Sequence, residues 1–275
     1  MSNSLTLFQH AGMYASFELR RLWQTRPGLM TLAATTVIWA LLFRYAIMPA
    51  ADLIASRGFI DFISGVFGNT GLQQLSQWPA PELAVYWFFS LLLLPLFSLF
   101  FTANQLCSDL ERGTLRFLSL RSSRTAIVLG RFAGQMLVQA CLILLTLLAT
   151  LLLASWRSGG VSFDMLSATL VILLNLLIVL LPFTALMSVF SALARSAKLA
   201  VSLAIVTLGL CFALLSWFIF YFPDFLFLLG YLPGAQVFQL LPLHGWQTLQ
   251  LAILPIAQAA ALLVLASIFV NRRAL

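Results

Sequence analysis

The stretch MLSATLVILLNLLIVLLPFTALMSVFSAL runs from Met165 to Leu193 without a single charged residue. A helix needs roughly 20 apolar residues to cross a bilayer core about 30 Å thick. This stretch is longer than that, so it predicts a membrane-spanning helix that tilts within the bilayer or projects from it.

Five further apolar runs predict helices of the same kind. Together the expected spans are residues 29–48, 84–106, 126–154, 165–193, 199–222 and 250–270. Hydrophobic residues make up 62% of the chain and charged residues only 8%, whereas soluble domains contain about 25% charged residues. The composition excludes a soluble globular protein. It predicts an all-α polytopic membrane protein, with residues 1–275 forming a single transmembrane domain.

The basic residues predict which side of the membrane each connection faces. With six spans, one side carries both termini and twelve basic residues: Arg20, Arg21, Arg26, Arg112, Arg116, Arg121, Arg124, Arg131, Arg195, Lys198, Arg272 and Arg273. The other side carries Arg44, Arg57 and Arg157. Because basic residues collect in cytoplasmic loops, both termini are expected in the cytoplasm. This excess of basic residues in cytoplasmic loops accounts for the net charge of +7, so no nucleic-acid partner is expected.

Residues 1–28 predict an amphipathic helix ahead of the first span. Apolar residues recur there at three- and four-residue steps, and charged residues lie between them. We expect this helix to lie in the inner membrane interface. Its candidate contact residues are Phe17, Glu18, Arg20, Arg21 and Trp23.

The two long outer connections differ in character. Residues 49–83 are polar and contain several glycines, whereas residues 223–249 are apolar but interrupted by Pro223, Pro233 and Pro242. A straight helix cannot pass through those prolines. The second connection is therefore either a short helix or re-entrant pair, or a loop packed on neighbouring helices.

The connection between the second and third spans carries an unusual concentration of charge. Seven of the chain's 23 charged residues (15 basic and 8 acidic) lie in DLERGTLRFLSLRSSRTAIVLGR, from Asp109 to Arg131. Ser108 and Glu111 have the spacing of a capping box, which predicts a helix that runs to about Leu120. Ser122 and Ser123 offer a second N-cap for the third span. Segment 108–123 is thus either a short amphipathic helix across the ends of two spans or an ordinary positively charged loop.

The segment LERGTLRFLSLRSSRTAIVLGRFAG resembles the signature of ABC-2-type transporter permeases. The matching positions are Glu111, Gly113, Thr114, Leu115, Leu118, Ser123, Arg124, Leu129, Gly130 and Arg131. The N-terminal FELRRLWQTRP also looks like the connecting helix of that family. By this resemblance, segment 108–123 is a coupling helix that docks into a separate ABC ATP-binding subunit, through Asp109, Glu111, Arg112, Gly113, Thr114, Leu115, Arg116 and Leu118.

The resemblance also implies the chain's partners and location. It implies a non-catalytic permease subunit in a bacterial inner membrane, surrounded by lipid, that works with a second permease copy, identical or a paralogue, usually in export. The chain has no GxxxxGK[ST] phosphate loop, so ATP and Mg²⁺ are expected on the partner subunit and no cofactor on this chain. His10 and His244 lie on opposite sides without a neighbouring acid, so neither catalytic nor metal-binding residues are predicted.

Several alternatives remain open at this level. The chain could be a permease like those of nitrous-oxide-reductase maturation, which act with a periplasmic accessory protein, or a membrane scaffold without transport. An ion-coupled transporter is disfavoured because the spans lack midplane carboxylates. Asn175, near the middle of the fourth span, is a candidate for the translocation path, or it bonds another helix. Gly130 and Gly134 either let two helices approach closely or share this spacing by chance.

Overall fold

The structure is a computed structural model that describes residues 2–55, 78–241, 243 and 245–272. Within these ranges the chain forms helices joined by turns. The α-helices are α1 (Ser2–Gln24), α2 (Arg26–Leu42), α3 (Met48–Ala55), α5 (Pro81–Phe101), α6 (Cys107–Glu111), α7 (Thr114–Arg121), α8 (Arg124–Ser158), α9 (Phe163–Leu193), α10 (Ala197–Tyr221), α11 (Ala235–Leu240) and α12 (Ile253–Arg272). A π-helix, η1 (Phe43–Ile47), and two 3₁₀-helices, η3 (Pro223–Tyr231) and η4 (Gly245–Ala252), complete the described elements.

Six helical segments in the described ranges are long and apolar enough to cross a membrane, which confirms the predicted architecture. They are Gly28–Asp52, Pro81–Phe101, Arg124–Ser158, Phe163–Leu193, Ala197–Tyr221 and Gly245–Arg272. The observed bounds differ from the predicted ones in all six spans, as the second and third spans illustrate. The second span ends at Phe101 and not at residue 106, and the third continues to Ser158, past residue 154.

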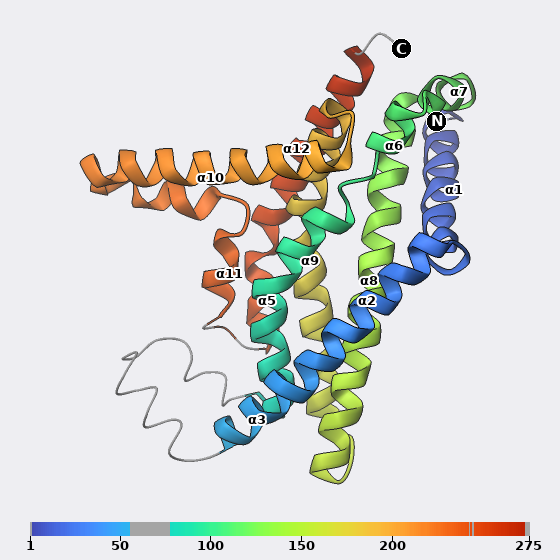
Figure 1. The fold of residues 1–275 in the computed structure, drawn as a ribbon. Coiled ribbons are helices and arrows are strands. Elements are labelled where there is room, and N and C mark those ends of the chain that lie inside the picture. The colour runs from blue at the N-terminus through green and yellow to red at the C-terminus, as the bar shows by residue number, and fades with distance from the viewer. Residues whose placement is uncertain (1, 56–77, 242, 244, 273–275) are drawn as a thin grey trace.

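Helix α9 forms the centre of the bundle, with α5, α8 and α12 around it (Figure 1). It starts at Ser162, whose hydroxyl accepts a hydrogen bond from the Met165 amide at 3.2 Å. Ile172 and Leu176 of α9 are fully buried, and so are Tyr86 and Trp87 of α5. A helix that is apolar on all sides is suited to the centre of the bundle, because none of its faces contacts water.

The helix predicted ahead of the first span is present as α1, and it ends before the predicted bound of residue 28. The Thr25 side chain caps α2 by accepting a hydrogen bond from the Gly28 amide at 3.3 Å, and Pro27 sits in the first turn of that helix. Proline is tolerated there because its missing N–H would have no partner in any case. Helix α1 therefore ends at Gln24, and α2 begins the first span at Arg26.

The chain changes direction after α9. Ala194 and Ser196 have extended backbone conformations, and α10 then projects sideways from the bundle (Figure 1). The η3 helix folds back against α10, where the rings of Phe218 and Phe225 lie 5.5 Å apart. Between residues 223 and 252 the described chain forms short helices, as the first of the two interpretations expected. Pro242 and His244 lie outside the described residues.

Candidate functional site

The charged connection lies at the end of the bundle that carries both chain termini, which we call the termini end (Figure 1). It links α5 to α8 through two short helices, α6 and α7. The predicted capping box is wrong. Helix α6 has no side-chain cap, Ser108 donates a hydrogen bond to the Asn104 carbonyl at 3.4 Å, and the Glu111 side chain is exposed.

Gly113 separates the two short helices. Its φ of 67° lies in the left-handed region, which L side chains rarely adopt, and it immediately precedes the first residue of α7. The predicted continuous helix is therefore two helices with a fixed turn between them. The second predicted cap is confirmed, because the Ser123 hydroxyl accepts a hydrogen bond from the Ala126 amide at 3.2 Å.

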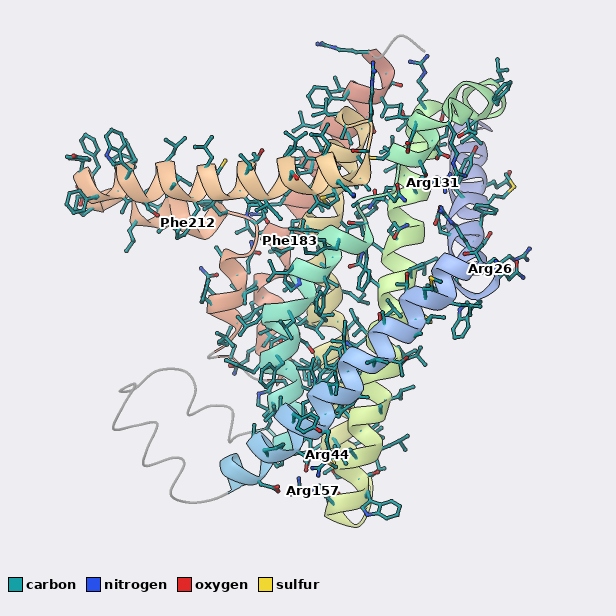
Figure 2. All side chains as sticks on the ribbon, in the orientation of Figure 1. Arg26, Arg44, Arg131, Arg157, Phe183 and Phe212 are labelled. Carbon is teal, nitrogen blue, oxygen red and sulfur yellow. The ribbon has the colours of Figure 1, made fainter. Side chains whose placement is uncertain are left out.

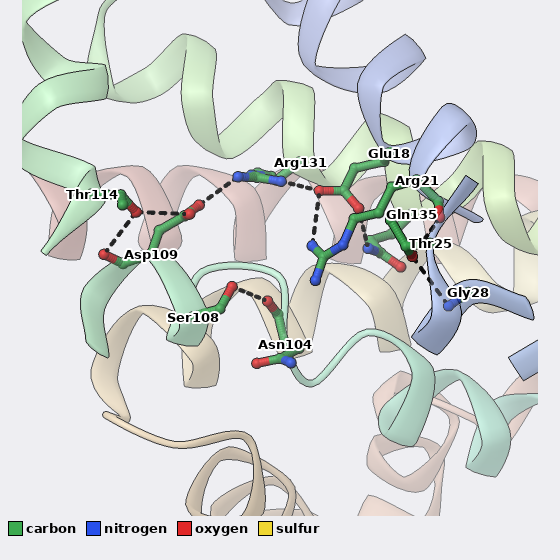
Figure 3. Close-up of polar contacts among 10 residues, drawn as sticks. All are labelled: Glu18, Arg21, Thr25, Gly28, Asn104, Ser108, Asp109, Thr114, Arg131 and Gln135. Carbon is green, nitrogen blue, oxygen red and sulfur yellow. Dashed lines mark hydrogen bonds and ion pairs between the residues drawn. The ribbon is translucent and has the colours of Figure 1, made fainter. Parts of the chain in front are cut away.

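A buried cluster of charges ties this connection to α1 and α8 (Figure 3). Arg131 of α8 forms ion pairs with Glu18 of α1 and with Asp109 of α6, the second at 2.6 Å between Nη2 and Oδ2. The three side chains are nearly inaccessible, at 8%, 5% and 13% exposure for Arg131, Glu18 and Asp109. Thr114, the first residue of α7, donates a hydrogen bond to Asp109 Oδ1 at 3.1 Å. One arginine thus joins three separate segments of the chain.

Two glycines allow α1 to lie directly against α8. A Cβ atom on Gly130 would lie 2.7 Å from the Cβ of Tyr14, and one on Gly134 would lie 2.8 Å from the Cβ of Glu18. Real Cβ atoms essentially never approach other atoms this closely. Of the two interpretations of the Gly130–Gly134 spacing, the structure supports close helix packing.

Other polar contacts attach the same region to its neighbours. Tyr14 of α1 and Ser122, just after α7, share a hydrogen bond of 2.9 Å between their hydroxyls. Arg124, at the start of α8, donates to the carbonyls of Val270 and Asn271 at the end of α12, at 3.2 and 2.9 Å. These carbonyls belong to the last turn of the helix, where basic side chains are favourable partners.

The predicted docking residues fall into two groups. Asp109 and Thr114 point inward to the charge cluster, and Leu118 packs on an apolar cluster that includes Ile127 and Val270. Glu111 and Arg112 are exposed. The backbones of Leu115 and Arg116 lie in α7, but their side chains are outside the described residues.

Two residues of α7 were missed by the sequence reasoning. Phe117 is 72% exposed and Leu120 is 83% exposed. Their spacing of three places them on one side of the helix, while Leu118 faces the core. The available signal was the three-residue spacing of these two large apolar side chains within α7.

The residues predicted to contact the interface in α1 also divide by burial. Glu18 is buried in the charge cluster, whereas Phe17, Arg20 and Trp23 are exposed and Arg21 is partly exposed. Helix α1 runs beside the first part of α8 (Figure 1). Its position in a membrane interface stays a prediction.

Both donors of the Asn175 side-chain NH2 group are bonded within the protein. Its side-chain amide donates to the carbonyl of Val171 at 2.8 Å and to the hydroxyl of Thr248 at 2.7 Å. These bonds connect α9 to η4, so the geometry favours the packing interpretation over the translocation path.

A second group of charges holds the opposite end of the bundle together. Figure 2 shows Arg157 and Arg44 there, far from Arg131. Arg157, at the end of α8, forms ion pairs with Asp52 of α3 and with the buried Glu82 of α5, the latter at 3.1 Å. Each end of the third span is therefore fixed to neighbouring helices by an arginine.

Comparison with known families supplies one match. The model of the family described as ABC-2 family transporter protein matches residues 25–271, which is nearly the whole chain. No curated protein in the comparison matches the sequence.

Proposed function

Since the chain belongs to the ABC-2 transporter family, we propose that it is the permease subunit of a transporter driven by ATP hydrolysis on a separate ATP-binding subunit. In this proposal the chain carries no ATP or Mg²⁺ itself, and both are bound by the partner. A second permease copy completes the membrane part. The termini end faces the cytoplasm of a bacterial cell, and the complex exports its cargo across the inner membrane.

The observation that carries this proposal is the outward surface of α6 and α7. It combines two large apolar side chains, Phe117 and Leu120, with the exposed charges of Glu111 and Arg112. Exposed apolar residues surrounded by polar ones are typical of protein interaction sites. Apolar anchors supply most of the affinity at such a site, while the charges set register and partner choice.

The attachment of this surface suits a mechanical role. Asp109 and Thr114 fix the two short helices to Arg131, and Arg131 fixes them to α1 and to the start of the third span. Arg124 extends the connection to the end of α12. A displacement of α7 by a docked subunit would therefore move these helices as one body, which is a recognised mode of conformational coupling.

Co-purification of the full chain from its native membrane tests this proposal. The variant carrying Phe117→Glu and Leu120→Glu places two charges on the outward surface of α7. The matched control is Phe163→Glu, because Phe163 is also 83% exposed but begins α9, next in the chain to the end of α8 that carries Arg157. We expect wild type and control to retain a stoichiometric ATPase with a phosphate loop, identified by mass spectrometry, and the double variant to lose it.

Two results would overturn the proposal. One is recovery of the intact chain without any ATPase in detergent mild enough to preserve complexes. The other is retention of the ATPase by the double variant, which would place docking elsewhere.

A further inference from the structure

A cavity lies inside the bundle between α2, α5, α8 and α9. Its buried end is lined by Thr35 and Trp39 of α2 and by Gln139 of α8. The cavity as a whole has about 30 Å³ of space that water-sized groups can occupy. That is more than the roughly 10–15 Å³ that one water-sized group occupies, and far less than a whole lipid.

Two polar atoms at this cavity have no partner among the described residues. They are Gln139 Oε1 and Thr35 Oγ1, on side chains that are only 4% and 8% exposed. The two other hydroxyls of the lining have partners, because Ser98 bonds Thr184 and Thr146 bonds Tyr86. Leaving a buried polar atom unpaired costs about 1–3 kcal/mol, so two of them at one cavity indicate a missing hydrogen-bonding group.

The chemistry of these atoms limits what can bind. The Gln139 amide nitrogen already donates to Thr184 Oγ1 at 3.0 Å, so its free oxygen can only accept a hydrogen bond. A carboxylate or phosphate offers no donor there, and no charged side chain lines the cavity to balance a cation. A hydroxyl fits best, because it can donate to Gln139 and accept from Thr35 at once.

The mouth of the cavity is apolar. The lining residues with the greater exposure are Ile38 of α2 and Leu94, Phe97 and Phe101 of α5. Including this open mouth, the empty space is about 450 Å³. Since α2 and α5 both belong to membrane-spanning segments, the mouth opens toward the hydrocarbon region of a bilayer.

We propose that this cavity binds the hydroxyl end of an uncharged, mostly apolar molecule that enters from the bilayer between α2 and α5. The hydroxyl occupies the buried end beside Gln139 and Thr35, and the apolar part lies in the mouth against Ile38 and Phe97. Binding of such a molecule does not depend on the ATPase, so it can be tested, and can fail, separately from the proposed function.

Photolabelling of the full chain in phospholipid vesicles without ATP tests the site. The probe is a long-chain alcohol with a diazirine in its chain, and its methyl ether serves as a matched probe that cannot donate a hydrogen bond. Thr35→Val removes only an unpaired hydroxyl and keeps the side-chain shape, so this variant should fold. Thr36→Val is the matched control, because Thr36 is exposed and its hydroxyl already donates to the Leu32 carbonyl at 2.8 Å.

We expect saturable labelling of peptides from α2 and α8, removed by excess unlabelled alcohol. Loss of one hydrogen bond should raise the half-saturating probe concentration roughly three- to tenfold for the ether and for Thr35→Val. Gln139→Leu should weaken labelling similarly, and Thr36→Val should match wild type. Equal labelling by alcohol and ether, or equal effects of the two threonine variants, would overturn the proposal. Labelling that never saturates would overturn it too, because the cavity would then hold only water.

Discussion

Replacement of Arg131 by methionine removes the one cation that two buried carboxylates share. Glu18 and Asp109, at 5% and 13% exposure, would then lose the cation closest to both. Among the described residues, Glu18 would keep Arg21 at 3.8 Å and Gln135 at 3.5 Å as its weaker partners. Asp109 would keep the hydroxyl of Thr114 at 3.1 Å, which carries no charge. Removing one member of a buried ion pair typically costs about 3–5 kcal/mol, because the remaining charge loses its compensation. The variant can relieve this cost by releasing α1 from α8 so that Glu18 reaches water.

The magnitude can be converted into an opening equilibrium. At 1.4 kcal/mol per tenfold change, the population with α1 detached should increase by roughly 10² to 4 × 10³. Limited trypsin digestion of the purified chain measures this population, because Arg20 and Arg21 in α1 are cleavable only when the helix opens locally. We expect cleavage at these two sites to be at least about 100-fold faster in Arg131→Met.

Two controls make the result specific. Arg112→Met makes the same chemical change at an exposed residue and should leave the cleavage rate unchanged. The triple variant Glu18→Gln, Asp109→Asn, Arg131→Met removes all three charges and should recover most of the protection, since buried ion pairs can often be replaced by neutral groups at little cost. Wild-type cleavage of Arg131→Met would refute the reasoning and show that packing alone holds α1.

Three further outcomes follow from the geometry. Gly134→Val should weaken the packing of α1 on α8 by about 1–3 kcal/mol, because the new Cβ would lie 2.8 Å from the Cβ of Glu18. A Cβ at Gly160 would contact nothing, so Gly160→Ala should leave the cleavage rate in the same digestion assay unchanged. Gly113→Val should lower the stimulation of the ATPase by the permease without lowering membrane insertion. The reason is that the left-handed conformation at this position costs a branched side chain about 1–2 kcal/mol or more. Full stimulation of the ATPase would contradict a role for this turn. Arg157→Met should leave the buried Glu82 without its partner and lower the melting temperature in detergent by several degrees, and an unchanged melting curve would count against this ion pair as a structural element.

The membrane architecture was predictable because it depends on local composition. A run such as Met165–Leu193 has no other stable environment, so its length alone identifies a span. The N-cap predicted at Ser122 or Ser123 shows the same locality, because the Ser123 hydroxyl bonds an amide three residues away. The end of α5 was placed too late, since Leu106 and Cys107 are apolar and buried although the backbone from Thr102 to Leu106 forms turns.

The candidate site depended on contacts that the sequence does not encode locally. Glu18 and Arg131 are 113 residues apart, and the sequence around each residue does not indicate that the other is its partner. Asp109 was predicted to face a docking subunit on the basis of the resemblance to ABC-2-type permeases, yet its pairing with Arg131 makes burial favourable. Gly113 was taken as part of a continuous helix because the Ser108–Glu111 spacing matched a capping box, and its left-handed conformation overrode that local signal.

The charge cluster also constrains the order in which relatives of this chain can change by mutation. A first step that loses Arg131 leaves two buried acids with only the more distant Arg21 beside Glu18, whereas a first step that neutralises Asp109 leaves the Glu18–Arg131 pair intact. Lineages that lose the charge cluster should therefore lose one of its acids before they lose the arginine. Among sequences of the family, an arginine with one acid should be found as an intermediate, and two acids without the arginine should be rare.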